Sequence, residues 1–593
     1  MNPDSKSVAV LDADKGDLIR EIAVGERPSS VTIDLQDRAW ISCRDSDEIY
    51  VVTGSGSVVR RLALARGSRP TGILASADGA QIFVAEYATG RVRRFNAATF
   101  AETGVAYVGP TPESMTLTTS GLLLVTRFIS GSGEGQVYGV HSASMTAIAP
   151  IRLTLDSTSM ENGSSARGVP NYVRSLAASP GDERVWYVAK KDNVLRGQMR
   201  DGNRLTHETT VRPLVGRVDP RARTERVAER LDVDNSSLPA AIAFSPSGAH
   251  AFVALEGNNK VIVLNVAAGE KIVEASVGFA PEGIAIDPTT KHVFVQNLLG
   301  RSVTVLAGNR VMDHGDPALP VLATVDTVAT ELMSTQVLRG KQVFYDAADA
   351  RMSLEGYLSC ATCHLDGGSD GRIWDFTDQG EGLRRTIVLR GRGGLDHGMV
   401  HWSGNFDEIQ DFEIPIRGKF GGTGFMPTKH FNSNPLAAPN AGRSSDLDAL
   451  ASYLGSLTQF APSPFRQADG TLTAAGMRGR NIFQRQNCAD CHGGPAFTDS
   501  PRAALHDVGT LTARSGSRLG STLAGLDTPT LLGLWENAAF LHDGSARRLE
   551  DVLTHPGAAA HGSMNQLSAS ERTDLAAYLL QIDSTEPAPT ARP

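Results

Sequence analysis

A proline-anchored repeat in the N-terminal half constrains the fold more than any other feature of this chain. Its anchor is G-x-x-P or the proline alone. The same number of residues separates Pro28 from Pro70, Pro70 from Pro112, and Pro239 from Pro281. After each anchor come an alternating apolar strand, a turn and further short strands. Four short strands in a period of about 42 residues are typical of one β-propeller blade. We therefore predict a propeller over residues 1–320.

The number of blades depends on the long span between Pro112 and Pro239. This span is close to three periods, but it shows only one looser anchor, near residues 173–188. Two polar stretches within it, residues 156–168 and 212–230, are typical of loop insertions. Seven blades with one degenerate, or six blades with insertions, both fit this pattern. We predict seven.

The two ends of the repeat region each contain part of a repeat. Residues 8–10 begin part-way through a period, and residues 302–306 end part-way through one. We therefore expect the two ends to share one blade and close the ring. The strand segments 252–254 and 262–264 resemble those of the YVTN-type propeller family. That resemblance implies a fold and a surface on which a protein partner could dock, but no chemistry.

The C-terminal half carries C-x-x-C-H twice, which is the attachment signature of c-type haem. The first copy comprises Cys360, Cys363 and His364, and the second comprises Cys488, Cys491 and His492. In such a motif both thiols bond to the haem vinyl groups, and the histidine becomes the proximal iron ligand. A zinc site is the alternative, but each cysteine pair has its own adjacent histidine and the two pairs lie far apart in the sequence. We predict two covalently attached haem c groups, with His364 and His492 as iron ligands.

Similar segments surround the two motifs, which indicates an internal duplication. An Arg-Gly segment at residues 339–344 or 478–483 precedes each motif, and an amphipathic helix ending in Leu-Ala-x-Tyr-Leu follows it. We predict two mainly α, class-I-like cytochrome c domains, over residues 334–461 and 465–583. Residues 584–593 are rich in proline and are predicted to be a disordered tail. The fifth cysteine, Cys43, is expected to be a small buried hydrophobe.

The motif order in the C-terminal half resembles that of the bacterial di-haem cytochrome c peroxidase family. Residues 528–535, with the sequence TPTLLGLW, and residues 540–552, which contain FLHDGS and LEDV, match the family's second-domain signature. In the first copy, RTIVL at residues 385–389 and WSG at residues 402–404 lie where the family has related segments. The resemblance covers about residues 334–583.

This resemblance implies roles for several residues of the first copy. Trp402 matches a tryptophan placed between the two haems, and Gln410 matches a distal glutamine. The family's distal glutamate has no match here, and Glu413 is the nearest substitute for an acid/base group that moves a proton between peroxide oxygens. Arg385 replaces an asparagine that in the family helps to bind an inter-haem calcium ion, so the support for calcium here is weak.

Axial ligands decide whether each haem passes electrons or binds peroxide or O₂. In the family the second haem takes a ligand beyond the LEDV segment. The candidates here, in order of preference, are His555, Met564 and His561. For the first haem, three histidines are candidate sixth ligands or distal donors: His397, His401 and His430.

Composition excludes some classes of partner. The formal net charge of −8 argues against a nucleic-acid partner, and no apolar run is long enough to predict a transmembrane helix. Residues 1–11 lack the pattern of a signal peptide. Because covalent haem is attached outside the bacterial cytoplasm, we expect a periplasmic or otherwise extracytoplasmic chain whose leader is not part of the given sequence.

We predict a peroxidase-like oxidoreductase that uses hydrogen peroxide or O₂ at the first haem and relays electrons through the second. Its electrons would come from a donor protein or another redox substrate. One alternative is a non-catalytic electron-transfer protein in which both irons have six ligands. In a third interpretation the propeller is the functional part and recruits a partner.

Overall fold

A computed structural model describes residues 1–13, 16–181, 184–391 and 398–590. The chain forms two compact units. The first comprises Met1–Asn193, Val211–Ser334 and Tyr345–Thr362, and the second comprises Val194–Thr210, Thr335–Phe344 and Cys363–Pro593. Each unit is described below by itself.

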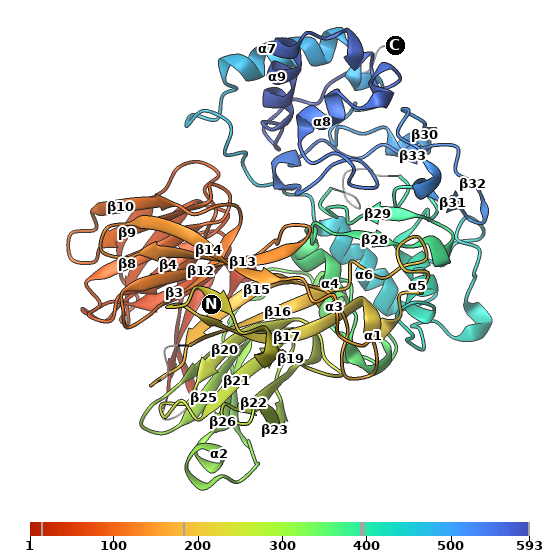
Figure 1. Cartoon of the computed structure of the whole chain (residues 1–593). Helices are drawn as coiled ribbons and strands as arrows, with labels where there is room; N and C mark the ends of the chain where they lie inside the picture. The colour runs from red at the N-terminus through yellow and green to blue at the C-terminus, as the bar shows by residue number, and fades with distance from the viewer. Residues whose placement is uncertain (14–15, 182–183, 392–397, 591–593) are drawn as a thin grey trace. The chain divides into compact units, whose positions relative to one another are not determined.

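The first unit is a β-propeller of six antiparallel sheets that follow one another along the chain (Figure 1). The first sheet contains β3 Pro28–Ile33, β4 Arg38–Cys43, β5 Glu48–Thr53 and β6 Val58–Ala63. The second contains β7 Pro70–Ala75, β8 Gln81–Glu86, β9 Arg91–Asn96 and β10 Glu102–Tyr107. The third contains β11 Pro112–Leu117, β12 Leu122–Arg127, β13 Glu134–His141 and β14 Thr146–Thr154. The fourth sheet contains β15 Val169–Ala178, β16 Val185–Asp192, β17 Val211–Asp219, β18 Thr224–Glu225 and β19 Leu231–Asp232. The fifth contains β20 Pro239–Phe244, β21 His250–Leu255, β22 Lys260–Asn265 and β23 Glu270–Ser276. The sixth contains β24 Pro281–Ile286, β25 His292–Asn297, β26 Ser302–Ala307 and β27 Val321–Asp326.

The prediction of seven blades is wrong, because the span between Pro112 and Pro239 holds two sheets rather than three. Its strands are longer than those of the regular repeats, with nine residues in β14 and ten in β15. The insertion Val194–Thr210 leaves the propeller altogether and belongs to the second unit. Long strands and insertions therefore use up the residues that a third blade would need.

The two ends do not share a blade either. The last sheet takes all four of its strands from Pro281–Asp326. The N-terminal strands β1 Ser7–Asp12 and β2 Asp17–Ala23 form a two-stranded sheet of their own. Side-chain hydrogen bonds connect the N-terminal segment to the end of the last sheet, since Asn2 Nδ2 donates to the carbonyl of Thr327 (2.8 Å) and Thr327 Oγ1 donates to Asn2 Oδ1 (3.0 Å).

Hydrophobic side chains of neighbouring sheets form the core of the propeller. Phe83 of β8 and Leu123 of β12 belong to one such cluster, and every residue of β21 except His250 is buried. β21 is thus covered on both faces, and its residues after His250 are all apolar instead of alternating with polar ones. Cys43 is fully buried in the cluster formed with the β1–β2 sheet, and burial raises the pKa of its thiol to about 12. The prediction of a buried hydrophobe is confirmed.

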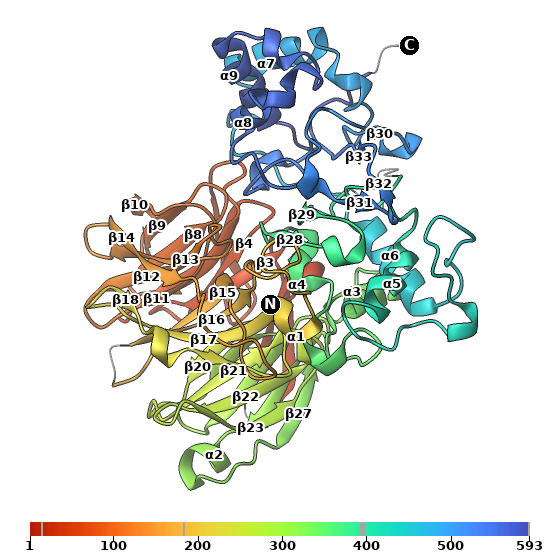
Figure 2. The same ribbon diagram turned by 45° about the vertical axis from the view of Figure 1, so that its right-hand side comes forward.

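In the second unit, two pairs of helices repeat one packing arrangement (Figure 2). Helices α3 Thr335–Tyr345 and α6 Ser445–Ser456 form the first pair, and α7 Ala474–Arg485 and α9 Ala569–Leu579 form the second. A Cβ atom on Gly340 would overlap the carbonyl oxygen of Ala449, and one on Gly479 would overlap that of Asp574. Only glycine allows these helix backbones to approach so closely.

An aromatic contact accompanies each glycine crossing. The rings of Phe344 and Tyr453 are 5.2 Å apart at 68°, and those of Phe483 and Tyr578 are 5.5 Å apart at 67°. These are edge-to-face geometries, which aromatic rings prefer. The duplication inferred from the sequence therefore extends to the packing of the helices, while the class-I cytochrome fold and the predicted domain boundaries stay predictions.

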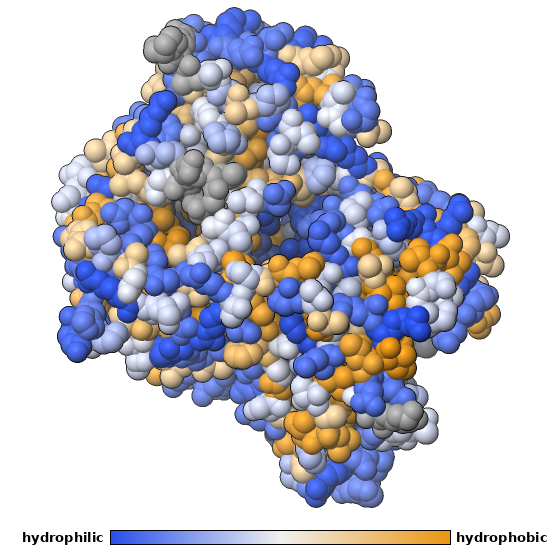
Figure 3. Space-filling model, turned by 180° about the vertical axis from the view of Figure 1, so that it is seen from behind, coloured by the Kyte–Doolittle hydropathy of each residue, from blue (hydrophilic) through white to orange (hydrophobic). Residues whose placement is uncertain are grey.

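Short elements complete the two units. The remaining helices are α1 His207–Thr210, α2 Asn309–His314, α4 Ala361–His364, α5 Glu413–Arg417 and α8 Leu549–Leu553; the remaining strands are β28 Ile373–Asp375, β29 Leu383–Arg385, β30 Leu505–His506, β31 Ser517–Arg518, β32 Ser521–Thr522 and β33 Leu526–Asp527. Within the described residues no helix has the length and apolarity needed to cross a membrane. On the face shown in Figure 3, hydrophilic and hydrophobic residues are interspersed.

Candidate haem centres

The two C-x-x-C-H motifs hold their histidines in the same way. The Nδ1 atom of His364 donates to the carbonyl of Gly368 (3.2 Å), and Nδ1 of His492 donates to the carbonyl of Phe497 (3.2 Å). A backbone hydrogen bond of this kind fixes the tautomer and the ring orientation, and it leaves Nε2 as the metal-binding atom. Within the described part of the chain, the motif cysteines form no disulfides.

Burial keeps these groups uncharged at neutral pH. It lowers the pKa of His492 to about 4 and also lowers the pKa of His364. Burial raises the pKa of the Cys360 and Cys488 thiols to about 12. A neutral imidazole is the form that binds a metal ion, so both histidines are in the state that iron ligation requires.

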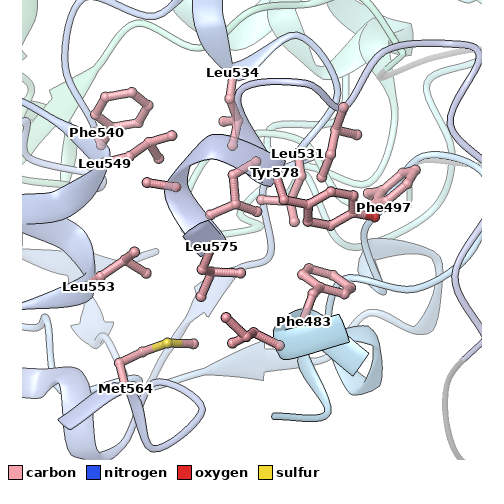
Figure 4. Close-up of a cluster of buried hydrophobic side chains, with 14 of the residues drawn as sticks. Phe483, Phe497, Leu531, Leu534, Phe540, Leu549, Leu553, Met564, Leu575 and Tyr578 are labelled. Carbon is pink, nitrogen blue, oxygen red and sulfur yellow. The ribbon is translucent and has the colours of Figure 1, made fainter. Parts of the chain in front are cut away.

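An apolar cavity lies beside the second motif. Cys488, Cys491 and His492 line one part of it, and side chains from the hydrophobic cluster around α7 and α9 line much of the rest (Figure 4). The cluster side chains that line the cavity are Phe483, Leu531, Leu532, Leu534, Phe540, Leu549, Leu553, Met564, Leu575 and Leu579. A wide apolar cavity with both cysteines and the histidine at its wall fits a covalently attached haem.

The cavity separates the three candidates for the second sixth ligand. His561 lines it, and the rings of His492 and His561 have centroids 6.4 Å apart. Met564 is buried and also lines the cavity. His555 is not among the described lining residues, and its Nδ1 accepts a hydrogen bond from the amide of Gly557 (3.0 Å). His561 and Met564 therefore line the cavity together with His492, whereas His555, the candidate ranked first from the sequence, is not among its described lining residues, and the identity of the ligand stays a prediction.

Trp402 lies where the two copies meet, in the wall of the same cavity. It is buried, and its Nε1 donates to the carbonyl of Arg385 (2.9 Å). The guanidinium of Arg385 lies over the indole ring, 5.3 Å from its centroid, and donates to Asn537 Oδ1 (3.0 Å). The ring of Trp402 also lies near the ring of His542, with centroids 6.4 Å apart at 66°. Arg385 thus connects Trp402 to the second copy.

His542, which lies in the FLHDGS segment, is almost fully buried in the cavity wall. Its Nε2 is 2.7 Å from Ser515 Oγ. Burial lowers the pKa of His542 to about 4, so the ring is neutral at pH 7. Ser515, His542 and Trp402 form a chain of contacts from a surface loop to the cavity.

The two residues predicted on the distal side of the first haem are occupied by structural contacts. Glu413 is fully buried and accepts hydrogen bonds from Arg417 Nε (2.7 Å) and from the amides of Phe425 (2.9 Å) and Met426 (3.0 Å). Gln410 donates to Asp448 Oδ1 (2.8 Å) on α6. These bonds anchor a loop, and in Glu413 they occupy acceptor sites that a distal acid/base group would offer to a ligand.

A carboxylate that the sequence did not single out, Glu381, takes part in a different arrangement. His401 Nδ1 lies 2.8 Å from Asn405 Oδ1 and 3.4 Å from Glu381 Oε1. Burial would raise the pKa of Glu381, but its hydrogen bond to His401 and the charges of His401 and Arg384 lower it to about 2. His401 has a left-handed backbone, with φ of 68°, which is uncommon outside glycine and clusters at functional sites. In the sequence, only the position of His401 relative to the first motif could have indicated this arrangement of His401, Glu381 and Asn405.

The other candidates for the first haem do not join this arrangement. His430 is exposed, and its carbonyl accepts a hydrogen bond from Arg443 Nη1 (2.6 Å). His397 lies outside the described residues. Of the two candidates that the structure describes, His401 is the one whose charge contributes to the lowered pKa of His364.

These observations define a class: a six-bladed propeller joined to a duplicated unit that carries two haem-attachment motifs. No protein-family model matches the chain. Hydrazine synthase subunit gamma of Kuenenia stuttgartiensis is 32% identical over 272 residues, covering 39% of this chain and 74% of that protein. The methylamine utilization protein MauG of Methylorubrum extorquens is 30% identical over 305 residues, covering 45% of this chain and 82% of that protein. The chain therefore belongs to the family that includes these two proteins.

The match to MauG agrees with the resemblance to di-haem cytochrome c peroxidases seen in the motifs. Among solved structures, a chain of hydrazine synthase from Kuenenia stuttgartiensis is similar at a TM-score of 0.44 and 15% identity, covering 52% of this chain and 94% of that one. The assignment of the propeller to the YVTN type stays a prediction.

Proposed function

We propose that this protein is a di-haem c-type oxidoreductase in which the second haem relays electrons and the first is the reactive centre. The relationship to hydrazine synthase subunit gamma and MauG supports the redox class. Covalently bound haem would supply the redox chemistry and the binding of peroxide or O₂. The chain's own residues would hold the haems, set their axial ligands and supply protons.

The observation that carries this proposal is the distance between His492 and His561. The ring centroids are 6.4 Å apart and both rings line the same cavity, a separation that leaves room for a metal ion at metal–nitrogen bonds of about 2.0 Å. His492 and His561 would therefore hold the iron of the second haem together. An iron with two strong protein ligands passes electrons and does not bind peroxide.

The first haem would use His364 as its proximal ligand and the His401–Glu381 pair as its proton-transfer group. Reducing one peroxide molecule to two waters consumes two electrons and two protons. The electrons would come from a donor through the second haem, past Trp402 in the cavity wall. Protons would pass through His401, which Glu381 and Asn405 orient. The oxidised substrate would be a partner cytochrome, a protein side chain or a small organic molecule.

One observation favours the alternative of an electron carrier. A histidine whose Nδ1 is held by a carboxylate and an amide oxygen resembles a metal ligand with its supporting groups. If His401 binds the first iron through Nε2, both irons have six ligands and no peroxide site remains.

Adding stoichiometric hydrogen peroxide to the ferric and half-reduced protein, while following the Soret band, separates these functions. An enzyme should show a rapid change that reverses when an electron donor is added. The reversal should be slower in Trp402→Phe but unchanged in Trp374→Phe, a buried tryptophan on β28 that does not line the cavity. If peroxide changes neither state while small reductants still exchange electrons with the protein, the catalytic function is wrong and the carrier function stands.

The propeller would dock the partner that supplies electrons or is oxidised, because broad propeller faces suit protein contacts. Haem c is attached outside the bacterial cytoplasm, and we propose a periplasmic or surface location for this protein on that ground. Chemical cross-linking of the full chain to a reduced cytochrome c, followed by mass spectrometry, would test the docking role, since the cross-links should fall on Met1–Asn193 or Val211–Ser334.

A further inference from the structure

Four segments of the second unit meet at a pocket that the haem proposal does not use. The insertion Val194–Thr210 contributes Met199 and Arg200, and the β28–β29 strands contribute Ile373 and Leu383. Arg514 comes from the loop before β31, and Asp543 and Arg547 come from the loop before α8. We call this site the arginine pocket, after Arg200, Arg514 and Arg547.

The segments around the pocket are held by specific hydrogen bonds. The amide of Met199 donates to Asp375 Oδ2 (2.7 Å), and Arg200 Nη2 donates to the carbonyl of Ile373 (2.6 Å). A Cβ atom on Gly197 would overlap the side chain of Asp375, so this turn approaches β28 as only glycine allows. The pocket is therefore a preformed site.

The charges in the pocket are unbalanced. Three guanidinium groups and one carboxylate, that of Asp543, line the pocket. The Oδ1 atom of Asp543 already accepts hydrogen bonds from the amide (3.0 Å) and the hydroxyl (2.7 Å) of Ser545. Among the residues that the structure describes, no carboxylate forms an ion pair with the side chain of Arg514 or Arg547. The pKa of Arg200 is lowered, first by burial and also by the charge of Arg514, while Asp375 opposes the shift. Like charges held together in an acidic protein, of net charge −8, indicate a site for an anion.

The pocket also has an apolar wall formed by Met199, Ile373 and Leu383. A bare phosphate ion would leave this wall exposed to water, whereas an organic acid would cover it. The planar fork of arginine matches the two oxygens of a carboxylate. We propose that the arginine pocket binds a small organic carboxylate, whose acid group lies between the guanidinium groups and whose apolar part lies on this wall.

The pocket is next in sequence to the contacts that lead to the cavity. Arg514 precedes Ser515, Asp543 follows His542, and Ser515 Oγ lies 2.7 Å from His542 Nε2. A bound carboxylate would therefore lie beside the chain of contacts that reaches Trp402. The binding inference itself rests on the pocket alone and stands whether or not the haems are catalytic.

Isothermal titration of the holoprotein with benzoate, benzamide and phosphate tests this inference. Benzoate should bind, and benzamide, which has the same ring without the charge, should not. Arg514→Gln and Arg547→Gln should each weaken benzoate binding roughly tenfold, as expected for the loss of one charge-assisted hydrogen bond. Arg548→Gln is the matched control, because Arg548 is exposed and adjacent in sequence but does not line the pocket. It should bind benzoate like the unmodified protein.

Four results would overturn the inference, and three of them concern benzoate and benzamide. These are no binding of benzoate, equal binding of benzamide, and benzoate affinity that neither Arg514→Gln nor Arg547→Gln changes. Phosphate binding as tightly as benzoate would also overturn it, since the site would then recognise inorganic anions without using its apolar wall. Because Arg514 and Arg547 are exposed, their substitution should leave the fold intact, and Arg514→Lys, which keeps the charge but loses the fork, should give an intermediate affinity.

Discussion

Gly479→Ala should destabilise the second helix pair, although alanine is the better helix former. In α7 an alanine gains about 1 kcal/mol of intrinsic helix propensity over glycine. Its Cβ atom would overlap the carbonyl oxygen of Asp574 and lie 2.6 Å from the Cβ of Tyr578, both on α9. Ordinary carbon contacts are about 3.5–4.0 Å, so the helices must separate by about 1 Å. Overpacking costs up to about 3 kcal/mol, which leaves a net loss of about 2 kcal/mol.

Thermal unfolding followed at the Soret band measures this effect, because Phe483, Leu575 and Leu579 of these two helices line the cavity beside the second motif, where the second haem is proposed to lie. A loss of about 2 kcal/mol should lower the midpoint by roughly 4–8 °C for a unit of this size. Gly476→Ala in the same helix is the control. A Cβ atom there would meet the side-chain amide of Gln581, at 2.7 Å from Nε2, so the cost should be that of displacing its hydrogen bonds to Thr473 and Ala577 and not that of separating two helices. If Gly479→Ala is as stable as Gly476→Ala, the close helix crossing is not what requires glycine.

Three further outcomes follow from the site. Cys488→Ala should impair covalent attachment of the second haem only, read as haem content after denaturation; two haems still held by both thiols would exclude the attachment role. His561→Ala should convert the second iron from low-spin to high-spin in an electron paramagnetic resonance spectrum, while His555→Ala should not, and the reverse result would restore the order inferred from the sequence. Glu381, with a folded-state pKa of about 2 against an ordinary 4.5, stabilises the fold above pH 4.5 and loses this contribution as the pH falls towards 2. The stability deficit of Glu381→Gln, measured by denaturant titration, should therefore shrink over that range by up to roughly 3 kcal/mol, and a deficit that is independent of pH would contradict the assignment.

The local pattern of the sequence determined several features of this protein. The regular spacing of the prolines predicted a propeller, because alternating strands and turns repeat within short stretches of chain. The C-x-x-C-H motifs identified Cys488, Cys491 and His492 as one group, since one short continuous segment carries all of its chemistry. The two Arg-Gly segments likewise indicated the duplicated helix pairs, because each of them is a short continuous segment that occurs in both copies.

Only the tertiary structure decided the number of blades and the composition of the sites. Insertions and longer strands change the number of residues per blade without changing the alternation, so the period alone predicted seven blades where there are six. The preference for His561 over His555, and the pairing of Glu381 with His401, depend on loops whose paths are set by long-range packing. The arginine pocket brings together Arg200, Arg514 and Arg547, which are far apart in the sequence. No local periodicity relates such residues, because their proximity comes from the way distant segments pack.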